Sequence, residues 1–159
     1  MNLKKIAIKK LKERGVDIKK LSKLIYEMQK EYNPKINIKD CDKAINNILN
    51  KREVTHTILT GIAIDECIEN KTFDKCLHNI INEDNSLYGI DEIIALSIVN
   101  IYGSIALTSF GYLDKTKPGI IGIIDKKGKE NNCCNTFLDD IVCAIVAAGC
   151  GKIAHQKKA

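Results

Sequence analysis

The chain has 159 residues, of which 45% are hydrophobic and 28% are charged. That length fits one domain with a proper core, and the composition is that of an ordinary globular protein, which excludes a disordered or fibrous chain. The net charge of +5 is modest, and the basic residues crowd the first 52 positions and the C-terminal tail. This distribution is typical of solvated helix faces. It also leaves open an anionic partner, either a phosphate-bearing molecule or a membrane surface.

The N-terminal third of the sequence predicts three basic amphipathic helices. Apolar residues recur with helical spacing in residues 2–14, 17–33 and 40–51, and a glycine or a proline stops the first two. Asp17 is placed to cap the second helix. None of the three carries an acidic pair in an apolar setting. We therefore expect residues 1–51 to form a wall or lid of a single domain that spans residues 1–159.

From residue 52 onward the sequence becomes more apolar and predicts the core of a helical bundle. Helices are expected at 54–68, 71–81 and 89–107, and from a cap at Thr136 to about His155. Residues 82–86 are expected to form a turn, and residues 110–132 a loop around Pro118-Gly119. Residues 89–107 are apolar on most sides, which is typical of a helix enclosed by others. With no convincing strand, the sequence predicts an all-α bundle of six or seven helices around a buried central helix at about 89–107.

An acidic pair flanked by apolar residues occurs three times, each time in a stretch typical of a buried helix. The pairs are Asp65-Glu66, Asp91-Glu92 and Asp139-Asp140. Burying an ionised carboxylate without a partner costs several kcal/mol, so such groups are usually paired or bind a metal. No lysine or arginine falls inside these apolar runs, and carboxylate oxygens suit Mg²⁺, Mn²⁺ or Ca²⁺. The predicted metal ligands are Asp65, Asp91, Glu92, Asp139 and Asp140. Helix capping or solvent exposure is the alternative for any single carboxylate.

Two further groups of polar residues are candidates for contacting a substrate. Lys115 and Lys117 lie in the predicted loop, with Asp114 as a further acid, and each lysine is also compatible with a solvated loop. A polar seam follows one narrow stripe of the predicted central helix and consists of Ser97, Asn100, Ser104 and Thr108. The seam either lines a site, with Asn100 contacting the substrate, or bonds to neighbouring helices.

The cysteines and the N-terminus bear on redox state and location. The seven cysteines contain no C-x-x-C pair and mostly sit in apolar helical patterns, so reduced structural thiols are expected. The N-terminus lacks the apolar core of a signal peptide. Residues 93–113 carry no charge, but their serine, threonine and asparagine content favours a core helix over a membrane span. We expect a cytoplasmic protein, with peripheral membrane contact and homo-oligomer formation left open.

Four segments of the chain have the character of family motifs. They are TGIAIDE, LYGIDEIIALSIVNIYGSIA, KPGIIG and TFLDDIVCAIVAA, which follow one another between residues 60 and 148. Together they resemble the phosphatidylglycerophosphatase A family, in particular its short soluble branch from Gram-positive bacteria. The resemblance implies an all-α fold with one central helix and Mg²⁺-dependent removal of a phosphate from a phosphomonoester. It matches the acidic motif of the family's final helix to Asp139-Asp140, and its glycine-proline loop to Lys117-Pro118-Gly119.

The leading hypothesis is a Mg²⁺-dependent phosphoric monoester hydrolase that acts on phosphatidylglycerophosphate or on a related lipid or soluble phosphate. Asp139, Asp140 and Glu92 would place the metal that activates water, and Lys115 and Lys117 would steady the phosphate. No nucleic-acid partner is expected. Two alternatives stay open at this point. One is an all-α nucleoside triphosphate pyrophosphohydrolase, and the other is a non-catalytic module whose carboxylates bind Ca²⁺ for structure.

Overall fold

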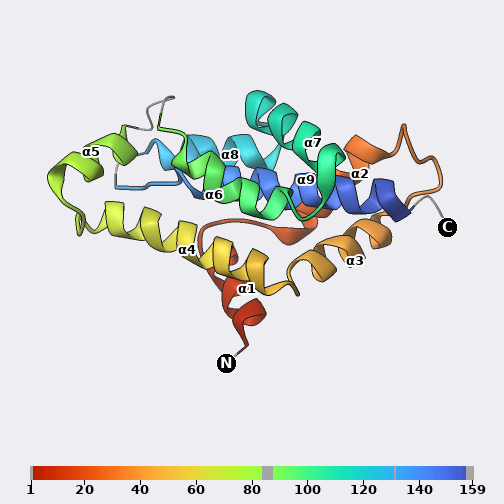
Figure 1. Cartoon of the computed structure of the whole chain (residues 1–159), viewed down its shortest axis with the longest axis horizontal. Helices are drawn as coiled ribbons and strands as arrows, with labels where there is room; N and C mark the ends of the chain where they lie inside the picture. The colour runs from red at the N-terminus through yellow and green to blue at the C-terminus, as the bar shows by residue number, and fades with distance from the viewer. Residues whose placement is uncertain (1, 84–87, 131, 157–159) are drawn as a thin grey trace.

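The computed structural model describes residues 2–83, 88–130 and 132–156, and within these ranges every regular element is an α-helix (Figure 1). The helices are α1 (Leu3–Glu13), α2 (Ile18–Gln29), α3 (Ile38–Ile48), α4 (Arg52–Glu69), α5 (Lys75–Asn82), α6 (Ile90–Val99), α7 (Gly103–Thr116), α8 (Ile120–Gly128) and α9 (Leu138–Gln156). The predicted all-α fold is confirmed. The described residues contain nine helices, however, which is more than the six or seven predicted.

Four of the helices begin where a polar side chain precedes the apolar pattern. The side chains of Asn2, Asp17, Asn37 and Asp74 accept hydrogen bonds from first-turn backbone N–H groups of α1, α2, α3 and α5. Those N–H groups have no partner within their own helix, so each cap stabilises its helix by about 1 kcal/mol. The predicted cap at Asp17 is confirmed.

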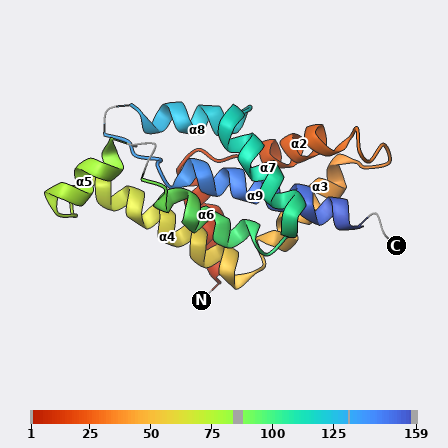
Figure 2. The same ribbon diagram turned by 45° about the horizontal axis from the view of Figure 1, so that its top comes forward.

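The central helix is α9, which runs through the middle of the molecule (Figure 1, Figure 2). It contacts α2, α3, α4, α6, α7 and α8, and all of its residues except Lys152, Ala154, His155 and Gln156 are buried. Its many alanine and glycine residues keep its surface low, so the neighbouring helices pack close to its backbone. The bundle therefore does surround one buried helix, but the prediction that this helix lies at 89–107 is wrong.

Residues 89–107 form parts of two helices rather than one central helix. α6 ends at Val99, and α7 begins at Gly103, whose φ of +79° lies in the left-handed region that favours glycine. Both helices pack on α9 through one face, and on the opposite face Ile93 and Leu107 are 61% and 50% exposed. The four residues of the predicted polar seam, Ser97, Asn100, Ser104 and Thr108, are all exposed, and the Ser97 hydroxyl forms a hydrogen bond with that of Thr57 of α4 at 2.7 Å, which confirms bonding to a neighbouring helix for this residue.

The predicted loop at 110–132 is largely helical. α7 continues to Thr116 and α8 follows at Ile120, so the short segment Lys117-Pro118-Gly119 alone turns the chain between them. Pro118 cannot continue α7 because it lacks the backbone N–H that the helix requires. Of the turn expected at 82–86, Asn82 ends α5 and Glu83 is its C-cap, whereas residues 84–86 lie outside the described ranges.

The basic N-terminal helices pack on two different helices of the core. α2 and α3 pack on α9, and α1 packs on α4 (Figure 2). Two ion pairs join α1 to α4, from Lys10 to Glu66 at 2.6 Å and from Arg14 to Glu69 at 2.8 Å. In the part of the chain that the structure describes, no helix has both the length and the apolar character needed to cross a membrane.

Candidate functional site

The first turn of α9 is where the acidic motifs meet. Asp139 and Asp140 begin this helix and are almost entirely buried, with 6% and 3% of their surface exposed. The N-terminus of a helix carries a partial positive charge, which favours carboxylates at these positions. The predicted cap at Thr136 is wrong, because α9 begins two residues later, at Leu138, and the N–H groups at its start donate to Asp65.

Asp65 of α4 caps α9 from across the core. Its side chain is fully buried, and its two oxygens accept hydrogen bonds from the backbone N–H groups of Phe137 and Leu138 at 3.1 and 3.0 Å. The thiol of Cys134 donates to the same carboxylate at 3.4 Å. Burial raises the pKa of Asp65 to about 7, although these hydrogen bonds oppose the rise. Asp65 was predicted as a metal ligand, but both of its oxygens are directed to the start of α9.

Three carboxylates and one ammonium group form the centre of the site. Asp114 lies in the last turn of α7, and Lys117 is the C-cap of that helix. The Lys117 Nζ lies 2.9 Å from a carboxylate oxygen of Asp114, 2.5 Å from one of Asp139 and 3.7 Å from one of Asp140. We refer to Asp114, Asp139 and Asp140 as the carboxylate cluster. Lys117, predicted as a phosphate contact, thus lies against the acidic motif of α9.

The carboxylate cluster is only partly neutralised by this lysine. Burial raises the pKa of Asp140 well above its usual value, and the charge of Asp139 raises it further, while Lys117 lowers it. Burial lowers the pKa of Lys117, but its carboxylate partners, Asp139 foremost, more than reverse this and raise it, so the ammonium stays charged. A cation of higher charge would relieve more of the remaining repulsion between the carboxylates.

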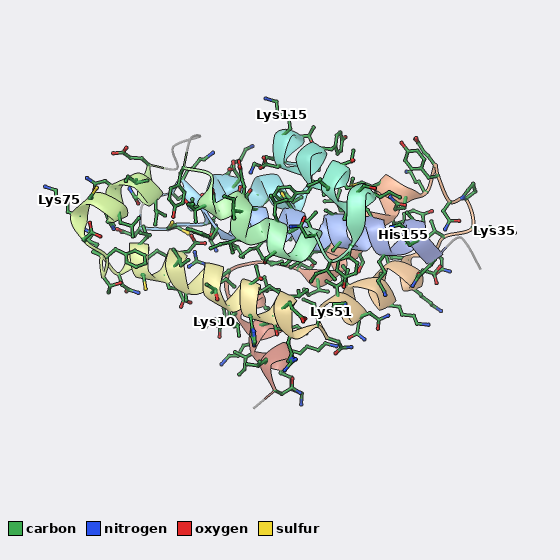
Figure 3. The ribbon with its side chains drawn as sticks, viewed as in Figure 1. Lys10, Lys35, Lys51, Lys75, Lys115 and His155 are labelled. Atoms are coloured by element: carbon green, nitrogen blue, oxygen red, sulfur yellow. The ribbon has the colours of Figure 1, made fainter. Side chains whose placement is uncertain are left out.

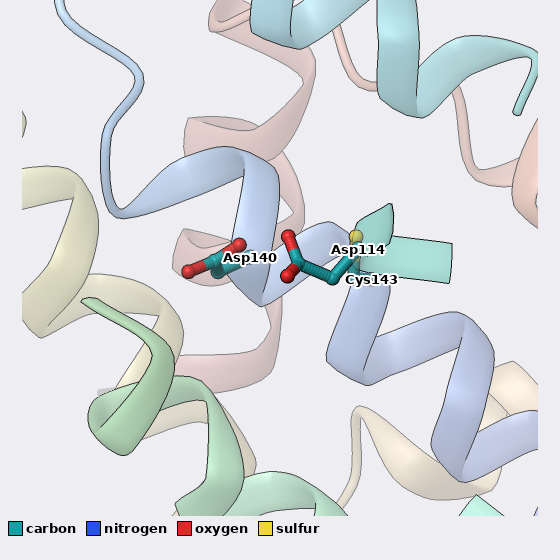
Figure 4. Close-up of side chains that lie close together, drawn as sticks. All are labelled: Asp114, Asp140 and Cys143. Carbon is teal, nitrogen blue, oxygen red and sulfur yellow. The ribbon is translucent and has the colours of Figure 1, made fainter. Parts of the chain in front are cut away.

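Cys143 lies one turn further along α9 and joins two members of the cluster. Ligand atoms of Asp114, Asp140 and Cys143 all lie within 4.8 Å of one another (Figure 4). This spacing fits one ion, because metal–oxygen bonds of about 2.0–2.6 Å bring ligand atoms to within roughly 5 Å of one another. Burial raises the pKa of the Cys143 thiol, so the carboxylates are the anionic donors. A donor set dominated by carboxylate oxygens fits Mg²⁺ or Mn²⁺.

The acidic motif of α6 contributes one inward carboxylate. Asp91 is half-buried, and its charge is among those that raise the pKa of Asp140, so it acts on the cluster. Glu92 is exposed, because adjacent residues of a helix point about 100° apart. In the motif of α4, Glu66 likewise turns away from the buried side and pairs with Lys10.

Two predicted substrate contacts lie away from the cluster. Lys115 is exposed and projects outward from α7 (Figure 3), because residue 115 is helical and points about 100° away from Asp114. Asn100 is the C-cap of α6, whereas Asp91 is in its first turn. Asn100 and Asp91 are therefore separated by roughly 13 Å along the axis of α6. Of the three predicted substrate contacts, Lys117 is the one that the fold brings to the carboxylates.

A polar cavity of about 550 Å³ adjoins Asp139. Its walls come from the end of α5, from α8 and from residues 132–136, and include Glu83, Asp125, Lys129 and Asn135. No spacing pattern in the sequence marks these residues, because they come from three separate segments. Asp139 belongs to both the cavity and the carboxylate cluster, so a ligand in the cavity would lie next to the cluster.

Arg14 ties the N-terminal helices to the segment that leads into α9. Its guanidinium donates to the carbonyl oxygen of Cys134 and, at 2.7 Å, to Oδ1 of Asn135. Glu69 holds the same guanidinium by an ion pair at 2.8 Å. The basic N-terminal part therefore helps to position the start of α9, even though it supplies no residue of the carboxylate cluster.

The sequence model of the phosphatidylglycerophosphatase A family matches residues 7–155. The chain belongs to the phosphatidylglycerophosphatase A family. The match extends from α1 into the last turn of α9, so it includes the carboxylate cluster, Asp65 and the walls of the cavity. The resemblance seen in the four sequence segments is confirmed.

Relatives share the sequence and the fold over most of their length. The uncharacterized protein YutG of Bacillus subtilis is 46% identical over 149 residues, which cover 94% of this chain and 89% of YutG. A protein of unknown function from Bacillus stearothermophilus has a TM-score of 0.92 and 47% identity, covering 98% of this chain and 96% of its own. The low temperature requirement C protein of Listeria monocytogenes has a TM-score of 0.92 and 42% identity, and the match covers 100% of this chain and 99% of the Listeria protein. These likenesses support both the family and the fold.

The glycine-proline loop of this family member sets Lys117 against the carboxylate cluster. Lys117 and Gly119 both have positive φ values, +45° and +58°. Gly122, in the first turn of α8, lies so close that a Cβ there would approach the carbonyl oxygen of Lys117 to 2.5 Å. The KPGIIG segment therefore needs a glycine at position 122 for Lys117 to reach the cluster.

Replacing Gly122 with alanine should push the Lys117 backbone away from α8 and destabilise the protein by about 1–3 kcal/mol, as overpacking does. Gly111→Ala is a matched control, because Gly111 is exposed on α7 and a Cβ there would meet nothing within 4 Å. That variant should be as stable as the parent or slightly more stable, since alanine favours a helix. Equal melting temperatures for the two variants would contradict the close contact at Gly122.

Proposed function

We propose that this chain is a divalent-metal-dependent phosphatase that hydrolyses a phosphomonoester, either phosphatidylglycerophosphate or a related lipid or soluble phosphate. Membership of the phosphatidylglycerophosphatase A family supports a phosphatase of this kind. The single observation that carries the proposal is the buried carboxylate cluster, which lies beside a polar cavity and has one lysine in contact with it.

The residues proposed to hold the metal come from three helices. Asp114, Asp139 and Asp140 would be the main ligands, and Asp91 of α6 would complete the set, whereas the predicted ligand Glu92 is left out because it is exposed. A bound Mg²⁺ would supply positive charge to the phosphate and acidify water, which is the chemistry that carboxylate-held cations provide in phosphatases. Asp65 is proposed as a positioning residue rather than a ligand, because its hydrogen bonds orient the first turn of α9.

The side chains around the cavity would bind and orient the substrate. Lys117 would steady the phosphate next to Asp139. The cavity walls offer amide groups, including those of Asn82 and Asn132, to the alcohol part of the ester. Lys115 and Asn100 have no part in this proposal, because they lie on the outer side of α7 and at the far end of α6. A cytoplasmic location with peripheral contact to a membrane is consistent with a lipid substrate and belongs to the same proposal.

A product assay tests the proposal. The purified chain is incubated with phosphatidylglycerophosphate in detergent micelles, with a soluble phosphomonoester, or with a nucleoside triphosphate, in Mg²⁺, Mn²⁺, Ca²⁺ or EDTA. Orthophosphate released from a monoester with Mg²⁺ and lost in EDTA is the expected result. Pyrophosphate from the nucleotide would point to a pyrophosphohydrolase, and no product from any substrate would point to a non-catalytic metal-binding module.

Binding of a divalent cation should raise the melting temperature. A ligand at about 100 times its Kd stabilises the folded state by about 2.7 kcal/mol, which for a chain of this size corresponds to roughly 5–10 °C. Asp42→Asn, an exposed substitution on α3, should retain the full shift as a control. Melting curves that are unchanged by saturating Mg²⁺, Mn²⁺ and Ca²⁺ would remove the metal from the proposal.

A further inference from the structure

Lys117 holds a position that is unusual for a surface lysine. Its ammonium reaches all three members of the carboxylate cluster and connects the last turn of α7 to the first turn of α9. The side chain is only 27% exposed, and the side chains of Asp139 and Asp140 are 8% and 5% exposed. A cation therefore already occupies the centre of the proposed metal site, and it is a cation supplied by the chain itself.

This lysine is a poor match for the charge that surrounds it. One ammonium faces three carboxyl groups, whereas a divalent cation carries twice its charge and accepts oxygen ligands in a tighter shell. The ammonium and a metal ion would both draw on the carboxylates of Asp114 and Asp140. The two cannot share them, because like charges so close together in a buried site repel strongly.

The backbone of Lys117 adopts a conformation that is unfavourable for a residue with a side chain. Its φ and ψ of +45° and +52° lie in the left-handed region, which costs a residue with a side chain on the order of 1 kcal/mol. The following Pro118 favours an extended conformation at Lys117 instead. The Lys117 N–H donates to the carbonyl oxygen of Leu113 at 2.8 Å, so this conformation belongs to the end of α7, and the ion pairs of the ammonium act in addition to it.

The adjoining cavity indicates where the ammonium would act. Asp139, the carboxylate closest to Lys117, also lines the polar cavity. An ammonium released from Asp139 therefore stays at the edge of that cavity. Lys129, the lysine that lines the cavity in the described residues, is already paired with Asp125 at 3.1 Å.

We propose that Lys117 is an exchangeable internal cation: it neutralises the carboxylate cluster until a divalent cation takes those oxygens, and its ammonium then binds the phosphate of the substrate in the adjoining cavity. This inference rests on the proposed function and assigns one residue two successive roles. Loading of the metal and binding of the phosphate are thereby coupled, because the first event frees the group that serves the second.

Chemical labelling of lysines tests the exchange directly. The parent protein is treated with an amine-acetylating reagent with and without Mn²⁺, and labelling at each lysine is measured by mass spectrometry. Lys117 should be protected without Mn²⁺ and several-fold more reactive with it. Lys126, which is exposed in the last turn of α8, should label equally in both conditions. Labelling of Lys117 that does not change on Mn²⁺ binding would overturn the inference.

Calorimetric titration with Mn²⁺ gives a second readout that does not depend on turnover. Lys117→Met removes the competing ammonium and should bind Mn²⁺ more tightly than the parent. If the ammonium of the parent leaves the carboxylate cluster free to bind metal in about a tenth of the molecules, the gain in Mn²⁺ affinity is about 10-fold. The same variant should raise the KM for the phosphomonoester, because the phosphate loses its partner. Lys126→Met is the control and should match the parent in Mn²⁺ affinity.

The outcomes separate the inference from the proposed function. If Mn²⁺ fails to bind the parent and no phosphate is released, the proposed function is wrong. If Mn²⁺ binds and supports phosphate release, but Lys117→Met binds Mn²⁺ no more tightly than the parent, the exchange alone is wrong. The labelling experiment uses the unmodified chain, so it remains decisive even if Lys117→Met does not fold.

Discussion

Replacing Asp140 with asparagine should abolish phosphate release while leaving the metal-free protein at least as stable as the parent. The substitution keeps the volume of a side chain that is 3% exposed, but it removes the charge that would hold a cation. Replacing a residue that only supports a metal ligand typically lowers metal affinity or activity by about 10–100-fold. Replacing a ligand itself should therefore lower turnover by more than about 100-fold. Burial and the charge of Asp139 make an ionised Asp140 unfavourable in the metal-free protein. Asparagine has no charge, so the variant avoids this cost in the free energy of folding.

A neighbouring substitution provides the comparison. Asp139→Asn should also lose turnover, but it should melt at a lower temperature than the parent because Asp139 is the closest partner of Lys117. Both variants are measured by metal-free melting curves and by phosphate release with Mg²⁺. An Asp140→Asn protein that melts several degrees lower and retains full turnover would move the active site elsewhere.

Replacing Asp65 with alanine should destabilise the protein by about 2–4 kcal/mol, because two buried backbone N–H groups lose their acceptor. Those groups belong to Phe137 and Leu138, at the start of the central helix. Asp65→Asn retains one acceptor oxygen without a charge to bury, so it should be much less harmful. Urea unfolding measures the difference, and amide exchange of the two N–H groups should be faster in the alanine variant. Unfolding of the alanine variant at the same urea concentration as the parent would show that Asp65 is not a cap.

The same residue should make stability depend on pH. The pKa of Asp65 is raised from 3.8 to about 7 in the folded protein. Between these values the folded state holds a proton that the unfolded state has released, so the stability that this proton contributes is lost as pH rises toward 7. The parent should therefore lose stability relative to Asp65→Asn between pH 4 and pH 7. A constant difference between the two proteins over this window would contradict the raised pKa.

The sequence by itself determined most of the helices and the acidic motifs, although it missed α8 and the break between α6 and α7. Helical spacing of apolar residues and local signals such as the Asp17 cap depend on neighbours a few positions away, so they can be read from the chain directly. The same holds for Asp139-Asp140, since a carboxylate pair in an apolar run needs a partner wherever the run is buried. Lys117 could be proposed because it lies in a family motif beside a proline and a glycine.

Tertiary structure alone decided which helix is central. Residues 93–113 and α9 are both rich in apolar residues, and composition does not reveal whether neighbours cover a helix on one face or on all faces. α9 is enclosed because its small side chains let several helices approach, whereas α6 and α7 keep an exposed side. The break before Gly103 also depends on packing, because the Tyr102 carbonyl and Ala106 lie against Gly151 of α9.

Tertiary structure also decided the role of each carboxylate. Asp65 faces backbone N–H groups more than seventy positions away, and Asp114 and Cys143 meet Asp140 from different parts of the chain. A weak signal existed, since Asp114 precedes Lys117 by three residues and Cys143 follows Asp140 by three, which is helical spacing. Spacing shows which side chains share a face of one helix, but the partner of that face comes from another helix. Whether a buried carboxylate caps a helix, pairs with a lysine or binds a metal depends on which atoms packing brings within about 3 Å.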